Sequence, residues 1–230
     1  MKKITIFFVI IATAFTSCTT TKPILKTVAY KGIYSEKPLS ILVMPPINKT
    51  TAVDAKEYFH STLNIPLANA GFYVIPPYLS MEILKKESAY DGELFINAPL
   101  TKFGEIFGAD MVLFTIINKW DKTYGYVSVG VEYVIKSTKT NEILYSRKGT
   151  INYSTSVSNT GGGLVGALVS VAATAINTAA TKYVDVARVC NGYTLSDLPL
   201  GKYAPVNPKE SEEFAGKNEF NVTLNSKYGY

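Results

Sequence analysis

The apolar positions in the first half of the chain form two short continuous runs with a helical stripe between them. The runs Leu39–Pro46 and Phe72–Pro77 each end in Pro-Pro, which is typical of short buried strands. The stripe predicts a helix over 53–69, with Pro66 distorting its last turn. A strand, a helix and a second strand in such close succession predict a βαβ unit with parallel strands. The stripe consists of Val53, Phe59, Leu63 and Leu67.

Two more helices and a central strand are predicted next. Apolar spacing indicates helices at Tyr78–Lys86 and Ala98–Phe107, with a turn at Tyr90–Gly92 between them. The run Met111–Ile117 is the most hydrophobic part of the folded region, so we expect it at the centre of the sheet.

Strict alternation then replaces the continuous runs. From Tyr126 to Tyr133, valines alternate with polar or small residues, and a polar turn at Ser137–Glu142 leads to a second strand at Ile143–Ile151. This pattern is typical of antiparallel strands with one solvated face. The predicted fold is therefore α/β (α+β): a mixed sheet with a βαβ start and an antiparallel meander, with helices packed on it.

A Gly- and Ala-rich segment at 161–181 allows three interpretations. An apolar spacing of three and four residues favours an amphipathic helix laid on the sheet. The uncharged stretch is also long enough to span a bilayer, which makes a membrane-inserting helix an alternative. A phosphate-binding loop is the weakest reading, because no Lys-Ser/Thr follows the glycines. The stripe consists of Leu164, Leu168, Val171, Ala175 and Ala179.

The N-terminus has the organisation of a secretory signal. Lys2 and Lys3 precede an apolar run that is too short to be a typical membrane-spanning helix. The four residues Phe15-Thr16-Ser17-Cys18 resemble a bacterial lipobox. That resemblance implies cleavage before Cys18 and acylation of this residue. The alternative is an ordinary cleaved signal with an incidental cysteine.

The chain is expected to divide into four parts. We expect a signal peptide at 1–17, a lipidated tether with a short ordered end at 18–38, an α/β domain at 39–203 and a disordered polar tail at 204–230. Two or more acyl chains hold a protein stably at a membrane. Thr19, where inner-membrane lipoproteins commonly carry Asp, favours the outer membrane by analogy.

Charge and thiol content exclude some partners. Without Lys2 and Lys3 the net charge falls from +5 to +3, and no dense basic cluster suggests nucleic-acid binding. Once Cys18 is acylated, Cys190 is the one remaining thiol. We interpret it as a buried small apolar residue, with pairing between chains as the alternative.

The sequence shows no catalytic or metal-binding constellation. His60 is the single histidine, and neither a metal motif nor a cofactor motif is present. The Asp and Glu residues are scattered along the sequence, so their spacing does not identify a general acid and base. Trp120, near Tyr124 and Tyr126, is interpreted as core or hairpin packing, with a sugar- or peptide-binding surface as the alternative. We therefore expect no enzyme, no cofactor and no metal site.

Four strings behind the lipobox resemble a family of bacterial lipoproteins of unknown function, typified by a neisserial antigen. The resemblance covers Leu39 to Tyr203. It implies a fold like the N-terminal domain of TolB and the core of the curli secretion lipoprotein CsgG. It also implies a periplasm-facing accessory protein, and the family offers no catalytic residues to transfer. The strings are ILVMPPINKT (41–50), PLANAGFYVIPP (66–77), FGADMVLF (107–114) and GGLVGALV (162–169).

Two functions follow as hypotheses. The first is a lipoprotein anchored in the outer membrane through Cys18 that serves as a non-enzymatic interaction module of an envelope transport, secretion or assembly system. Its expected partners are the lipid bilayer, envelope proteins such as CsgG-like lipoproteins, or copies of itself. The alternative is a membrane-inserting or pore-associated subunit that uses residues 161–181.

Overall fold

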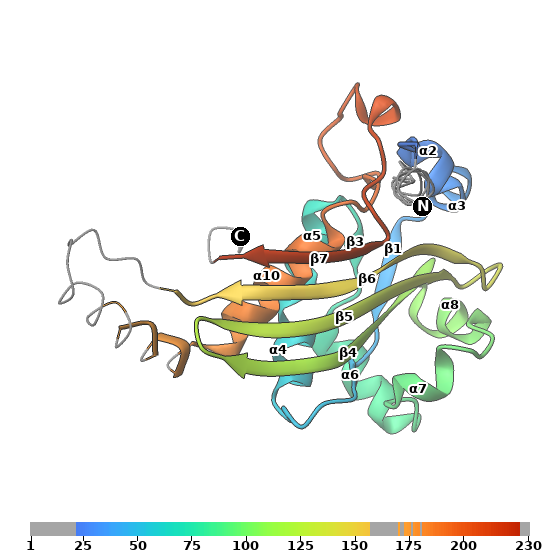
Figure 1. Ribbon diagram of the computed structural model, residues 1–230. Coiled ribbons are helices and arrows are strands. Elements are labelled where there is room, and N and C mark those ends of the chain that lie inside the picture. The colour runs from blue at the N-terminus through green and yellow to red at the C-terminus, as the bar shows by residue number, and fades with distance from the viewer. Residues whose placement is uncertain (1–21, 157–169, 171–172, 176, 180, 226–230) are drawn as a thin grey trace, which may run out of the picture.

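A mixed sheet organises the protein. The computed structural model describes residues 22–156, 170, 173–175, 177–179 and 181–225. In this part of the chain a seven-stranded sheet has the order β3-β1-β4-β5-β6-β7, and β2 continues the line of β1 along β4 (Figure 1). The strands are β1 (Ser40–Val43), β2 (Ile47–Asn48), β3 (Tyr73–Val74), β4 (Met111–Thr123), β5 (Tyr126–Ser137), β6 (Ile143–Ser154) and β7 (Glu219–Leu224).

The strand directions confirm the predicted fold class. β3, β1 and β4 are parallel, whereas β5 is antiparallel to both of its neighbours, β4 and β6. The predicted βαβ start and the antiparallel meander are therefore both present. β7 was not predicted, and it adds a parallel pair with β6 at the far edge of the sheet.

Helices cover both faces of the parallel half of the sheet. Successive residues of a strand point to opposite faces, so Ile41 and Val43 join one apolar cluster while Leu42 and Met44 join the other. The first cluster packs under α4, α5 and α10, and the second under α6, α7 and α8. These helices are α4 (Ala55–Thr62), α5 (Asn64–Asn69), α6 (Pro77–Lys86), α7 (Gly92–Phe95), α8 (Thr101–Phe107) and α10 (Tyr183–Leu195).

One face of the antiparallel half is polar up to Glu132, close to the prediction, but Val134 and Lys136 at the end of β5 pack against the α6–α8 layer. The helix-facing valines of β5 are fully buried, whereas the opposite face carries polar residues. On this face the ammonium of Lys148 lies 3.0 Å from a carboxylate oxygen of Glu219. Asn152 donates a hydrogen bond to Asn221 over 3.4 Å. We call this surface the open face.

The helix predicted over 53–69 is divided in two. Phe59, Leu63 and Leu67 are fully buried as predicted, but Val53 is 81% exposed and lies outside the helix. The break falls at Leu63. Pro66 explains it, because proline has no N–H to donate to the carbonyl four residues earlier.

Asp91 starts a helix where a simple turn was predicted. Its side chain accepts a hydrogen bond from the backbone N–H of Glu93 over 3.0 Å and caps α7. The predicted turn at Tyr90–Gly92 is therefore the entry to a short helix that packs Phe95 against Phe103.

α10 is the main helix that the sequence did not reveal. Its Asn191 is fully buried and donates to the backbone oxygen of Phe59 (3.0 Å) and to the hydroxyl of Thr62 (2.8 Å). Tyr133 donates in turn to the side-chain oxygen of Asn191. This network fixes α10 between α4 and the sheet.

Most of the Gly- and Ala-rich segment at 161–181 lies outside the described residues, but the described positions 170, 173–175 and 177–179 are helical, as one interpretation predicted. The predicted apolar stripe is wrong there, because Ala175 and Ala179 are exposed while Thr174 and Thr178 are buried. Thr178, which is described, bonds to Thr155 through their hydroxyls over 2.6 Å. The side chain of Asn177 donates to the backbone oxygen of Thr155 over 2.7 Å. Within the described residues, none of the helices has the length and apolarity needed to cross a membrane.

The expected tether and tail are folded together where they are described. Helices α2 (Lys26–Ala29) and α3 (Lys31–Glu36) and the 3-10 helix η1 (Glu210–Glu212) lie side by side beyond the end of the sheet (Figure 1). Ala215 N–H donates to the Ile24 oxygen over 2.7 Å and Lys26 N–H to the Glu213 oxygen over 2.9 Å. The disordered tail was therefore a wrong prediction for 204–225. We call residues 22–37 and 201–218 the cap.

Candidate functional site: an open sheet edge

β7 forms because its sequence alternates. Phe220, Val222 and Leu224 pack toward the helices, whereas the side chains between them are exposed. This period of two is the pattern of a half-buried strand. The signal is only six residues long, and it lies in a polar region, which is why it was read as disordered.

A glycine in β6 allows β7 to approach. Gly149 pairs with Phe220. A Cβ atom at Gly149 would lie 2.2 Å from the Phe220 backbone oxygen and 2.5 Å from its ring. Only a residue without a side chain fits here, so the position of β7 depends on Gly149.

A buried arginine ties β7 to the helix layer. Arg147 is 6% exposed and donates to the backbone oxygens of Tyr193 (2.9 Å) and Lys217 (3.2 Å). Its guanidinium also lies 5.1 Å from the centre of the Phe220 ring, a cation–π contact. The cation therefore joins the C-terminal end of α10 to the segment that enters β7.

Asp197 supplies the opposite charge at the same place. It accepts hydrogen bonds from the Gly216 N–H over 2.8 Å and from the Tyr30 hydroxyl. Burial and the hydrogen bond to Asp197 raise the pKa of Tyr30 well above its usual range. Tyr30 therefore stays neutral, and Asp197 joins the residue between α2 and α3 to the segment that enters β7.

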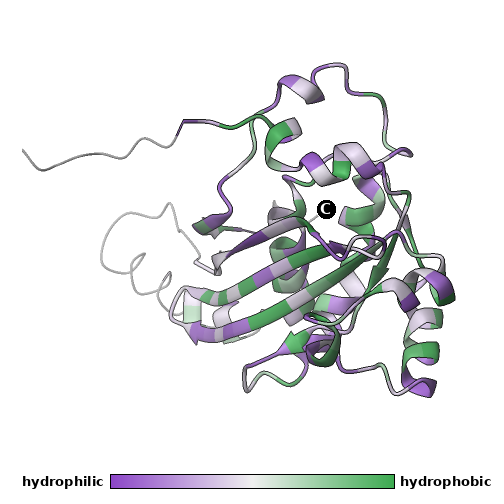
Figure 2. Cartoon of the chain, turned by 90° about the vertical axis from the view of Figure 1, so that its right-hand side faces the viewer, coloured by the Kyte–Doolittle hydropathy of each residue, from purple (hydrophilic) through white to green (hydrophobic). Residues whose placement is uncertain are grey.

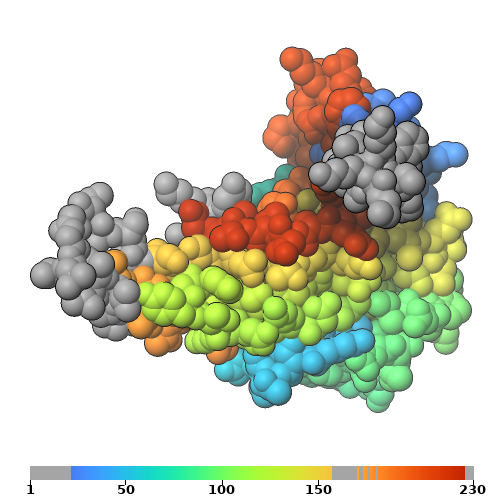
Figure 3. All heavy atoms as spheres, in the orientation of Figure 1, coloured from blue at the N-terminus to red at the C-terminus, as the bar shows by residue number. Residues whose placement is uncertain are grey.

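The outer side of β7 has no strand beside it among the described residues. Lys148 N–H donates to the Asn218 oxygen over 2.8 Å, which sets the phase of the parallel ladder. Because bonding alternates along a parallel strand, the backbone N–H and C=O groups of alternate residues point away from β6. These residues are Glu219, Asn221 and Thr223, and all three are exposed. We call this row the β7 edge; it runs along the rim of the molecule in Figure 3.

The opposite edge of the sheet is short and is covered at its start. β3 has only Tyr73 and Val74, and Pro76 and Pro77 follow it. Just before it, the Gly71 oxygen accepts a hydrogen bond from the Tyr203 N–H over 3.0 Å, so the chain after α10 covers this end.

The structure assigns structural roles to the other candidate residues. Trp120 is 8% exposed and packs against Tyr183 with ring centres 4.9 Å apart, which confirms core packing. Cys190 is a free thiol that is fully buried, as expected, and burial raises its pKa. His60 is half-buried, and burial lowers its pKa. Cys18 lies outside the described residues.

Asp110 of the FGAD string also has a structural role. It accepts hydrogen bonds from the N–H groups of Leu39 (2.9 Å) and Ser40 (3.2 Å), which start β1. Burial acts to raise the pKa of Asp110, but these bonds and the Lys139 ammonium outweigh it, so the pKa lies below its usual range. Across the described parts of the chain, no three His, Cys, Asp or Glu side chains converge to hold a metal ion.

Comparison with known proteins identifies the family. The sequence matches the family described as "Putative lipoprotein GNA1162-like" over residues 28–200. The chain belongs to this family. The lipoprotein NMB1124/NMB1162 of Neisseria meningitidis is 28% identical over 145 residues, which cover 61% of this chain and 66% of that protein. The family match confirms the resemblance seen in the sequence strings, and it makes the chain a member of a lipoprotein family of the cell envelope.

Three solved structures resemble part of this chain. The crystal structure of lipoprotein GNA1162 from Neisseria meningitidis is 26% identical, covers 60% of this chain and 98% of that one, and has a TM-score of 0.48. The PelC dodecamer from Paraburkholderia phytofirmans is 16% identical, covers 63% and 86%, and has a TM-score of 0.36. The LpoB C-terminal domain from Salmonella enterica is 15% identical, covers 55% and 94%, and has a TM-score of 0.36.

Proposed function

We propose that this protein is an outer-membrane lipoprotein, acylated at Cys18, that serves as a non-enzymatic interaction module of an envelope transport, secretion or assembly system. The observation that carries the proposal is the β7 edge, where three successive outward-facing residues present backbone donors and acceptors to solvent. An unpaired edge of this kind is a template for addition of a strand from another protein.

The side chains around the β7 edge fit a peptide partner. Asn221 and Thr223 are small and polar, and β7 contains neither proline nor lysine, the residues that commonly block an edge. The open face continues inward from the edge with Thr150 and Asn152, which pair with Asn221 and Thr223. A strand added beside β7 would gain backbone hydrogen bonds from the edge and side-chain contacts from Asn221 and Thr223.

The lipid anchor is the second part of the proposal. The lipobox resemblance and the family membership support acylation at Cys18, and Thr19 favours the outer membrane. Anchoring raises the effective concentration of the module near other envelope proteins. A weak edge contact then suffices for specific pairing at the membrane.

Isolation from cross-linked native envelopes tests the interaction. We expect a specific envelope protein to co-purify with the lipoprotein. Recovery of no specific protein, or of the lipoprotein alone as a monomer, would contradict the proposal. Recovery only of a second copy would assign the edge to self-association. Incorporation of labelled fatty acid into the wild-type chain and its loss in Cys18→Ala test the anchor separately.

A further inference from the structure

The lysines of the cap are mostly exposed and, among the described residues, unpaired, whereas most of its carboxylates accept hydrogen bonds from neighbouring residues. Glu210 accepts a hydrogen bond from the Leu200 N–H over 2.7 Å, and Glu213 from the Lys26 ammonium over 2.9 Å. Glu212 alone is exposed among the described carboxylates of the cap. Six cap lysines are exposed, and none of them forms an ion pair with another described residue: Lys22, Lys31, Lys37, Lys202, Lys209 and Lys217.

Large apolar side chains are exposed on the same cap. Val28 is 65% exposed, Phe214 58% and Val206 93%. Figure 2 shows hydrophilic and apolar positions side by side in the segment that begins at Lys22. Lysines around exposed apolar side chains are typical of surfaces that lie in the headgroup region of a membrane.

A pocket lies where the chain leaves the cap. Its volume is about 530 Å³, and Lys22, Ile24, Ala215 and Lys217 are among the residues that line it. Two lysines and one glutamate, Glu219, line it together with apolar residues, and the Lys148 ammonium lies 3.0 Å from the Glu219 carboxylate. The balance of charge and the apolar wall suit a phospholipid headgroup and the first part of its chains.

The distance to the lipid anchor limits where the cap can be. Lys22 is four residues after Cys18. Even a fully extended chain spans only about 14 Å over four residues. The cap therefore stays close to the bilayer once Cys18 is acylated, in contrast to the long tether that the sequence suggested.

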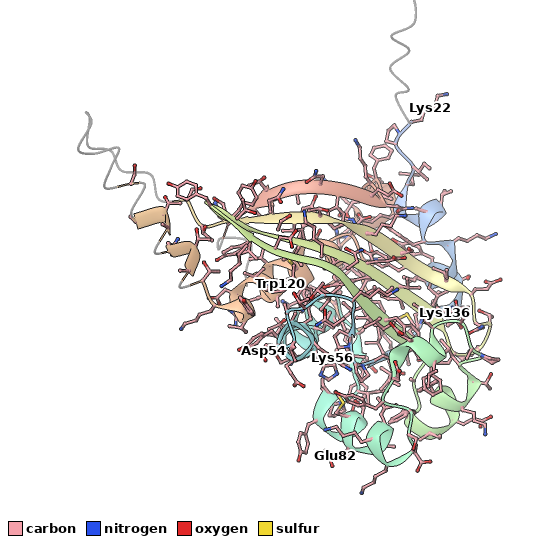
Figure 4. The ribbon with its side chains drawn as sticks, turned by 60° about the horizontal axis from the view of Figure 1, so that its bottom comes forward. Lys22, Asp54, Lys56, Glu82, Trp120 and Lys136 are labelled. Carbon is pink, nitrogen blue, oxygen red and sulfur yellow. The ribbon has the colours of Figure 1, made fainter. Side chains whose placement is uncertain are left out.

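We propose that the cap docks on the anionic headgroup layer of the bilayer that holds the acyl chains of Cys18. This inference rests on the proposed lipidation and adds an orientation to it. Figure 4 places Lys22 and Glu82 at opposite ends of the protein, so docking of the cap turns α6 away from the membrane. Glu219, the first residue of the β7 edge, lines the docking pocket, so docking leaves Asn221 and Thr223 for a partner in the periplasm.

Site-specific fluorescence tests the orientation in the acylated full-length protein on vesicles. Cys18 is blocked by its lipid and Cys190 is buried, so one introduced cysteine takes the dye. We expect spin-labelled lipid in vesicles with phosphatidylglycerol to quench a dye at Val28→Cys and to leave a dye at Glu82→Cys bright. High salt or pure phosphatidylcholine should weaken the quenching at Val28→Cys.

Charge variants give a matched control. Lys22→Gln and Lys31→Gln should each shift the docking equilibrium about fivefold toward the undocked state. Lys86→Gln in α6, the helix that carries Glu82, should leave it unchanged. Equal quenching of both dyes on acylated protein, or quenching insensitive to salt and lipid charge, would overturn the orientation alone. A mature chain without acyl groups would overturn the proposed anchor and the orientation with it.

Discussion

The two edges of the sheet differ in the ways that natural proteins use to protect or expose an edge. β3 is two residues long, ends at Pro76 and Pro77, and is covered at its start by the chain around Tyr203. β7 is six residues long, contains no proline, and has an outer row without a strand partner among the described residues. Shortness and prolines are typical protections of an edge, so the contrast supports the β7 side as the place of the proposed interaction.

The difference also shows how the open edge is stabilised. β3 follows directly from the βαβ unit at the start of the domain, whereas β7 comes from the end of the chain. β7 is fixed by tertiary contacts of Arg147 and Gly149. These contacts can be removed without changing β3, which makes the comparison testable.

The largest effect is expected from Arg147→Met. Methionine cannot donate to the backbone oxygens of Tyr193 and Lys217, which are then left without their charged donor. Because hydrogen bonds to a charged group are strong, we expect the free energy of unfolding to fall by about 3 kcal/mol. Amide hydrogen exchange in 219–224 should accelerate more than exchange in Tyr73–Ile75.

Lys136→Met is the matched control for this variant. Lys136 is also buried, but its ammonium donates to the Ile96 oxygen over 3.0 Å at the end of α7, away from β7 (Figure 4). We expect faster exchange around Ile96 and unchanged exchange in β7. Equal acceleration at both edges in Arg147→Met would show that the edges are not independent.

Gly149→Ala should have the next largest effect. The new methyl group would overlap the Phe220 oxygen, and overpacking of this kind costs about 2 kcal/mol. Denaturation should show lower stability, together with weaker protection of β7 amides. Ser146→Ala on the same strand should change stability by less than about 0.5 kcal/mol. If the Gly149→Ala variant is as stable as the wild type and its β7 amides stay protected from exchange, Gly149 and Phe220 are not as close as the structure shows.

Proline variants compare the edges directly. Asn221→Pro removes an outward N–H from β7, and loss of a backbone hydrogen bond to a partner should lower partner binding about tenfold. Val74→Pro removes an outward N–H from β3, because the Tyr73 and Ile75 N–H groups bond inward to Leu39 and Ile41. Quantitative co-purification should show the loss for Asn221→Pro only. Equal losses would remove the distinction between the edges.

Acid should loosen both edges slightly, through different groups. The Lys26 ammonium lowers the pKa of Glu213 near β7, and Asp110, near β1 and β3, also has a lowered pKa. Their stabilisation is therefore complete above the ordinary values of 4.5 and 3.8 and is lost as the pH falls through the lower folded values. Both groups are partly exposed, so each contributes less than about 1 kcal/mol.

Single substitutions separate the two acid effects. Exchange in β7 should lose its acid sensitivity in Glu213→Gln, and exchange in Tyr73–Ile75 should lose it in Asp110→Asn. Hydrogen exchange between pH 3 and 6 measures both. Acid sensitivity of both regions that persists in Glu213→Gln and in Asp110→Asn would assign it to other groups.

Strands with local signals could be predicted from the sequence. The continuous apolar run of β1 and the alternation of β5 predicted the fold class, because each pattern reports burial on two faces or on one. α10 could not be predicted in this way. Val184, Val186 and Val189 disfavour a helix locally, and the helix is stabilised by contacts such as Asn191 with Phe59, 132 residues away.

The candidate site was harder to predict for the same reason. The cap forms when residues 22–37 and 201–218 bond to each other, as Lys26 and Glu213 do across 187 residues. Neither segment by itself has an apolar pattern that would predict an ordered structure. The alternation of Phe220, Val222 and Leu224 was a usable signal for β7, but it is short and stands in polar surroundings.

Photocrosslinking from the two edges in intact cells tests the central claim most directly. A photoreactive amino acid would replace Asn221 on β7 in one strain and Val74 on β3 in another. We predict a specific crosslink to an envelope protein from Asn221 and none from Val74. A crosslink from Val74 alone, or no crosslink from either position, would contradict the assignment of the interaction to the β7 edge.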